Sequence, residues 1–67
     1  MAVIKYGVAK RNGLFYPVVF TPLDNGCVSP RAYKQASAAL RRAERWALDE
    51  SRYYSDVVIQ KWEHSVA

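Results

Sequence analysis

NGLFYPVVF, residues 12–20, is the stretch of the sequence that decides the fold. It begins with Asn-Gly, the pair that most strongly favours a two-residue hairpin turn, because a type I′ turn needs positive φ at both central residues. The β-branched and aromatic residues around it predict paired strands over residues 3–10 and 14–21. Every residue from 14 to 20 is apolar, aromatic or proline. Such a strand has apolar side chains on both faces of its sheet, so both faces need a cover.

A two-residue turn fixes the register of the hairpin, with Arg11 opposite Leu14 and Val8 opposite Pro17. Bonded and non-bonded pairs alternate from the turn outward, so Val8–Pro17 is a non-bonded pair. The missing proline N–H then lies on the side away from the first strand, and proline within a sheet belongs at an edge. The register therefore predicts that residues 14–21 form an edge strand and that residues 3–10 form the central strand.

The rest of the chain predicts one helix and one further strand. Ser29 is a suitable N-cap and Pro30 a suitable first helical residue, and the run that follows is rich in alanine, leucine and arginine. We expect a helix over 30–50, a strand over 56–62 and a short tail, EHSVA. The expected fold is a single small α+β domain over 1–67, with ββαβ topology. Its three-stranded antiparallel sheet, in the order 2-1-3, packs on one amphipathic helix.

The core is predicted from one face of the hairpin and one stripe of the helix. The continuous apolar face of the hairpin carries Ile4, Tyr6, Val8, Phe15, Pro17 and Val19. The stripe of the helix, at 100° per residue, contains Ala32, Tyr33, Ala36, Ala39, Leu40, Ala43, Trp46 and Ala47. Because the stripe is mostly alanine, we expect the helix to lie close to the sheet.

The second face of the hairpin has no equivalent cover. Its apolar residues lie beside Gly7 and Ala9, and an exposed apolar patch with a charged rim tends to mark an interaction site. Either the tail or residues 51–56, with Tyr53 and Tyr54, fold back over this face, or another chain covers it. We expect another chain, either a larger protein or a second copy. The candidate partner-binding residues are Lys5, Arg11, Leu14, Tyr16, Val18 and Phe20.

The predicted helix has a basic face opposite the alanine stripe. It carries Arg31, Lys34, Arg41, Arg42, Arg45 and Arg52, with Asp49 as the acidic residue among them. Arginine predominates, and its planar guanidinium suits carboxylate and phosphate. This face fits phosphates of a nucleic acid, acidic side chains of a protein, or solvent that keeps a small protein in solution.

Composition narrows the class of protein. The chain has 67 residues, 51% of them hydrophobic, and a formal net charge of +4, which permits an anionic partner without requiring one. Cys27 is the one cysteine, so no internal disulfide is available, and Cys27 with His64 makes no ligand pair at zinc spacing. We expect no metal and no cofactor. The sequence shows neither a signal peptide nor an apolar run of about 20 residues, so we expect a cytoplasmic protein with no membrane partner.

No catalytic arrangement is predicted. A nucleophile at Cys27 would need His64 and an orienting carboxylate beside it, and nothing in the sequence brings them together. The expected function is a small non-enzymatic protein-binding module, a stand-alone inhibitor or adaptor that occupies a surface of a larger partner. Phages and mobile elements encode many proteins of this size and type, and we name them as the expected source on that ground alone.

Two other functional hypotheses stay open at this point. The alternative is a nucleic-acid-binding protein that uses either the basic helix face or the aromatic sheet face. In the latter case Tyr16 and Phe20 would stack on unpaired bases. A homodimer whose interface is the second sheet face is compatible with either function.

Overall fold

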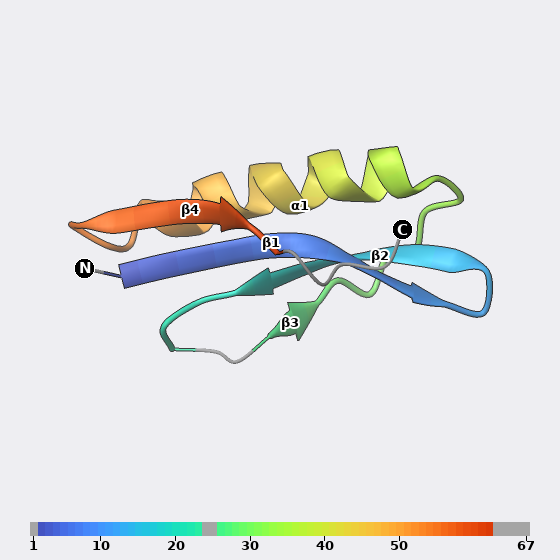
Figure 1. Cartoon of the computed structure of the whole chain (residues 1–67), viewed down its shortest axis with the longest axis horizontal. Helices are drawn as coiled ribbons and strands as arrows, with labels where there is room; N and C mark the ends of the chain where they lie inside the picture. Colours follow the sequence, from blue (N-terminus) through green and yellow to red (C-terminus); the bar gives the residue numbers. More distant parts are fainter. Residues whose placement is uncertain (1, 24–25, 63–67) are drawn as a thin grey trace.

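The computed structural model describes residues 2–23 and 26–62. Its elements are β1 (Ala2–Arg11), β2 (Leu14–Phe20), β3 (Cys27–Val28), α1 (Ala36–Ser51) and β4 (Val57–Lys61). The strands form one mixed sheet in the order β3-β2-β1-β4, and α1 lies along one face of it (Figure 1). The predicted α+β class with a single packed helix is thus confirmed, whereas the number and the direction of the strands differ.

The hairpin prediction is confirmed residue by residue. Asn12 and Gly13 have φ values of 54° and 77°, as a type I′ turn requires. Arg11 pairs with Leu14 and Val8 with Pro17, and the ladder continues to Lys5 opposite Phe20. The local chemistry of two turn residues therefore sets which side chains share a face along both strands.

The prediction that the second strand lies at the edge is wrong. β3 pairs with β2 through Val19 opposite Cys27, and the Ser29 N–H donates to the Pro17 carbonyl at 2.9 Å. Farther along, Phe15 and Tyr33 exchange two backbone hydrogen bonds of 2.8 Å. Pro17 is tolerated inside the sheet because its carbonyl is bonded there, while its missing N–H falls in the gap between these two short pairings.

The prediction of an all-antiparallel sheet is also wrong, because β4 runs parallel to β1. β3 carries the chain back toward the hairpin turn before α1 begins. The helix then returns along the sheet, so that β4 must run in the direction of β1 (Figure 1). Parallel strands need such a crossover connection. One missed strand of two residues thus reverses the predicted direction of the helix and of the last strand.

The helix begins later than predicted, at Ala36 instead of residue 30. Ser29 does not cap it: the Ser29 Oγ accepts a hydrogen bond from the Arg31 N–H at 3.2 Å, within the segment that pairs with β2. Gln35 is the N-cap, with extended backbone and no side-chain capping bond. Backbone pairing with β2 has therefore taken precedence over a favourable local capping sequence.

The predicted core face is confirmed, and so is the part of the alanine stripe that lies on α1, whereas Ala32 and Tyr33 of the predicted stripe precede the helix. Ile4 and Val19 of the sheet form a buried cluster with Ala47, and Ala39, Ala43 and Ala47 have no exposed surface. Larger residues pack around this cluster: Tyr6, Trp46, Tyr54, Val57 and Ile59. The three alanines allow α1 to approach the sheet closely, so the core depends on small side chains in the helix.

Tyr6 and Glu44 link the sheet to the helix at the margin of this core. The Tyr6 hydroxyl donates to the Glu44 Oε2 at 3.2 Å. Desolvation, followed by the hydrogen bond and charge of Glu44, raises the pKa of Tyr6. The folded chain therefore holds this proton more tightly, and the bond's contribution to stability is lost as the pH rises through the raised pKa.

Enlarging the central alanine of the stripe tests this close packing. We expect Ala43→Leu to lower the free energy of unfolding by about 1–3 kcal/mol, because the added carbons have no space between α1 and the sheet. The matched control is Ala38→Leu, at a helix position outside the buried stripe, which should change it by less than about 0.5 kcal/mol. Urea unfolding followed by circular dichroism measures both, and equal effects would contradict close helix–sheet contact at Ala43.

Candidate functional site

The sheet face that points away from α1 is called the open face here, and the strand registers define it. Lys5 pairs with Phe20, Ala9 with Tyr16 and Arg11 with Leu14. The same face continues onto the outer strands, through the pairs of Val18 with Val28 and of Val3 with Val58. Its side chains are those of Val3, Lys5, Ala9, Arg11, Leu14, Tyr16, Val18, Phe20, Val28, Val58, Gln60 and Trp62.

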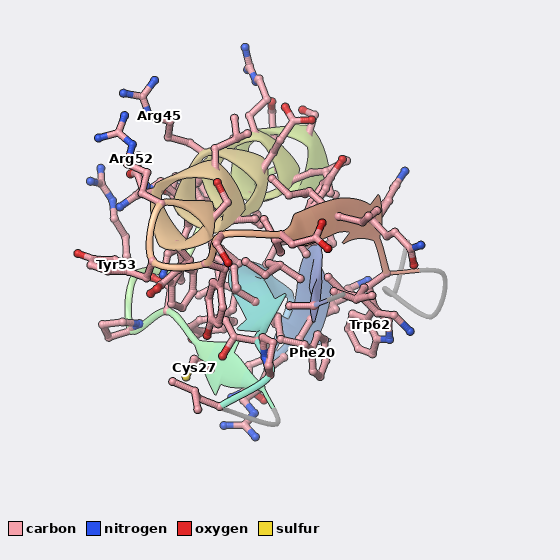
Figure 2. All side chains as sticks on the ribbon, turned by 90° about the vertical axis from the view of Figure 1, so that its left-hand side faces the viewer. Phe20, Cys27, Arg45, Arg52, Tyr53 and Trp62 are labelled. Atoms are coloured by element: carbon pink, nitrogen blue, oxygen red, sulfur yellow. The ribbon has the colours of Figure 1, made fainter. Side chains whose placement is uncertain are left out.

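An aromatic pair forms between Phe20, at the end of β2, and Trp62, the residue that follows β4. The ring centroids are 4.9 Å apart and the planes are inclined by 60°. Figure 2 shows both rings on the side of the sheet away from the helix. The backbone N–H of Trp62 donates to the Tyr6 carbonyl. This bond places Trp62 opposite Gly7, the residue after Tyr6. Because Gly7 has no side chain, the indole reaches over β1 to contact Phe20 on β2.

Phe20 is also supported from the loop before β3. Gly26 has a φ of 118°, and a Cβ at this position would lie 3.0 Å from the Phe20 Cε2. A residue with a side chain would therefore be strained in its backbone and would press against the ring. Gly26 and Trp62 together fix Phe20. Trp62 was missed in the sequence because its face depends on the parallel register of β4.

The exposure of the open face differs from the prediction at its centre. Val18, expected to be exposed, retains only 4% of its surface, while Leu14, Tyr16 and Phe20 are half-buried. The exposed apolar side chains are three valines on the outer strands and at the start of β1: Val28, at 58%, with Val3 and Val58. Lys5 and Arg11 are exposed, as expected. The partner-binding role of all these residues stays a prediction.

The chain's own residues 51–56 do not cover the open face. Tyr54 packs against the core cluster on the helix side, and Tyr53 is 82% exposed. The other cover considered from the sequence, the tail over 63–67, lies outside the described residues. A covering role for residues 51–56 is therefore wrong.

A shallow groove of about 380 Å³ lies at the hairpin end of the open face. It is lined by Ala9, Lys10, Arg11, Tyr16, Val28, Ser29 and Pro30. Arg11 and Tyr16, both predicted site residues, meet here, whereas Lys5 and Phe20 lie farther along the strands. Of the lining residues, Arg11 places its cationic side chain on this face, next to apolar walls, and none carries a carboxylate. This chemistry suits an acidic group that is carried beside an apolar one.

The predicted basic helix face is only partly helical. Arg31 and Lys34 precede α1, and the Arg31 guanidinium lies 5.4 Å from the centre of the Tyr33 ring. Arg41, Arg42 and Arg45 are exposed on the helix itself. Arg52 is its C-cap, and Figure 2 shows Arg45 and Arg52 pointing away from the sheet.

Few acids oppose these cations. The Arg45 Nε lies 3.7 Å from the Asp49 Oδ1, an exposed pair of little energetic weight. Arg45 and Arg52 point to the side of the molecule opposite the open face (Figure 2). A partner that lies flat on the open face therefore leaves these arginines uncovered, and a partner on the arginines leaves the open face uncovered.

Neither a metal site nor a membrane helix is found in the described part of the chain. Within residues 2–23 and 26–62, no three His, Cys, Asp or Glu side chains are grouped so that they could hold a metal ion. In the same residues, no helix combines the length and the apolar character needed to cross a membrane. His64, which was considered as a ligand or base, lies outside the described residues.

The contact between Phe20 and Trp62 can be measured by a double-mutant cycle. We expect Phe20→Leu and Trp62→Leu to show a coupling of about 0.5–1.5 kcal/mol in the free energy of unfolding, because each single change already removes the ring contact. The four proteins of the cycle are compared by denaturant unfolding. Effects that add to within about 0.3 kcal/mol would show that the rings do not stabilise each other.

The chain was compared with protein-family models, with curated proteins and with solved structures. No family model matches it, and neither a curated protein nor a solved structure is significantly similar to it.

Proposed function

We propose that the chain is a small non-enzymatic protein-binding module, an inhibitor or adaptor that covers a surface of a larger protein with its open face. The observation that carries this proposal is the apolar exposure of a face with no helix on it. Val3, Val28 and Val58 are exposed around the Phe20–Trp62 pair. Apolar surface gathered on one face of so small a chain is typical of an interaction site.

The arrangement of charge agrees with a protein partner. Lys5 and Arg11 are exposed on the open face, and its strand residues include no Asp or Glu. Protein interfaces commonly have aromatic and aliphatic side chains at the centre and polar groups at the rim. We infer that the partner surface is apolar at its centre and acidic where it meets Arg11 and the groove.

The aromatic geometry argues against base stacking on this face. Proteins that bind single strands present aromatic rings to successive bases. Here the ring centroids of Phe20 and Trp62 are 4.9 Å apart, and Tyr16 is half-buried. No row of free ring faces is available on the described strands, so this face supports a protein partner better than unpaired bases.

A second candidate function, binding to a nucleic-acid backbone, rests on the helix instead. Arg41, Arg42 and Arg45 are exposed on α1, and the 3.7 Å contact with Asp49 neutralises Arg45 only weakly. Arginines along one helix can follow phosphates without reading sequence. This candidate uses the opposite side of the molecule from the open face, so the two can be separated by mutation.

A matched pair of valine and leucine substitutions tests the proposed function. The tagged chain is used to capture its partner from a nuclease-treated host lysate, and the recovered protein is purified for calorimetric titration. We expect Val28→Asp to weaken binding at least tenfold, about 1.4 kcal/mol, because it places a carboxylate in the groove beside Arg11. Leu48→Asp makes the same kind of change at an exposed helix position. This control should bind like the wild type, and equal loss in both variants would contradict use of the open face.

Charge reversal on the helix separates the second candidate from the first. We expect the Arg41→Glu/Arg45→Glu variant to keep the affinity of the wild type for the protein partner, since both residues lie away from the open face. Binding to a fluorescent DNA duplex is measured by anisotropy at several salt concentrations. Tight binding with a steep salt dependence that this variant abolishes would favour the nucleic-acid function over the proposed one.

A further inference from the structure

The outer edge of β4 presents backbone groups that no described strand pairs with. The Ala2 N–H donates to the Asp56 carbonyl, and the Trp62 N–H donates to the Tyr6 carbonyl. Residues 56, 58, 60 and 62 therefore direct their backbone groups toward β1. By alternation, the N–H and C=O groups of Val57, Ile59 and Lys61 point away from the sheet. β4 is the last strand in the order β3-β2-β1-β4.

The two edges of this sheet are not equivalent. At the far side, β3 is only two residues long and is soon followed by Pro30, which has no N–H to offer. Short edge strands and proline are common protections against pairing with another chain. β4 has five residues without proline or glycine, and Lys61 is its one charged residue. Among the described elements, β4 therefore offers the longer edge for strand addition.

We propose that the β4 edge pairs in antiparallel fashion with the β4 edge of a second copy of this chain. Centred on Ile59, the pairing sets Ile59 opposite Ile59 of the second copy and Val57 opposite Lys61 of the second copy. Each of these is a bonded pair, in which both residues exchange N–H···O bonds. The result is one continuous sheet across two chains, with both helices on one side and both open faces on the other.

The side chains of β4 favour a second copy of the chain as the partner at this edge. α1 packs mainly over β1 and β2, which leaves Val57 and Ile59 half-buried at the margin of the core. The pairing brings these aliphatic residues of both chains together. It opposes no like charges, since Lys61 meets Val57 of the other copy. The assembly stops at two copies, because the β4 edge of each chain is then paired.

The dimer interface at the β4 edge is separate from the open face, which the proposed function uses. An experiment can therefore contradict the dimer without contradicting the proposed function, and the reverse. The pairing leaves both open faces exposed on the same side. Each chain has a formal net charge of +4, so mutual repulsion opposes association at low ionic strength. Measurements therefore belong at about 0.15 M salt, where charges farther apart than about 8 Å are screened.

A proline at residue 61 tests the pairing. The Lys61 N–H points away from β1, so Lys61→Pro removes a bond of the proposed interface and none of the ladder to β1; proline is tolerated at such edge positions. Sedimentation equilibrium of the wild type should give a mass twice the 7.6 kDa of one chain. Lys61→Pro should give the single mass with an unchanged circular dichroism spectrum. Lys61→Gln, which keeps the N–H and removes the charge, should still form the dimer.

Amide exchange at Ile59 is the second measurement, and it does not depend on the proline variant. In the wild type, the exchange of the Ile59 N–H should slow at least tenfold as the protein concentration rises through the dimer range. A wild type that stays monomeric to about 1 mM overturns the proposal. So does a Lys61→Pro variant that stays dimeric, because the interface then lies elsewhere. Exchange at Ile59 that stays the same at every concentration of the wild type would also overturn it.

Discussion

The positive φ angles of Asn12 and Gly13 are the constraint on which the rest of the structure depends. A two-residue turn allows only one register, and a shift of one residue would exchange the two faces of both strands. With this register, Ile4 and Val19 face the helix while Lys5 and Phe20 face away from it. The turn thus assigns the core face and the candidate binding face together.

The size of the helix explains why the second face is left without one. α1 has 16 residues, and its buried side chains are Ala39, Ala43 and Ala47. Alanines bring the helix close but bury little surface each, so α1 covers β1 and β2 and reaches β4 only slightly. Among the described residues α1 is the one helix, so the other side of the sheet has none. The open face and the β4 edge are both consequences of one narrow helix on a four-stranded sheet.

The sequence predicted what local chemistry decides and missed what depends on partners far along the chain. The turn, the register, the core face and the alanine stripe follow from φ preferences and periodicity, and they were predicted. β3 was missed because Cys27 and Val28 lie among turn-forming residues and carry no strand signal of their own. Because β3 was missed, the last strand was predicted to be antiparallel, β2 was predicted to be the edge strand, and the helix was predicted to begin at Pro30.

The candidate site was predicted where it depends on the hairpin and missed where it depends on β4. The open face and its cations follow from the hairpin alone, and Arg11 and Tyr16 do line the groove. Trp62 and Val58 could not be assigned to this face without the parallel register. The burial of Val18 was not predicted either, because residues on the face away from the helix were expected to be exposed.

The contact between Trp62 and Phe20 connects the stability of the fold to its proposed use. β4 is held by its ladder to β1 and by few helix contacts, so this aromatic pair is its link to β2 on the open side. A partner that covers the open face buries the same two rings. By linkage, a partner that binds only the folded chain also stabilises it. Binding and the docking of β4 are therefore coupled, and the last strand of the sheet should become more protected from exchange when the open face is occupied.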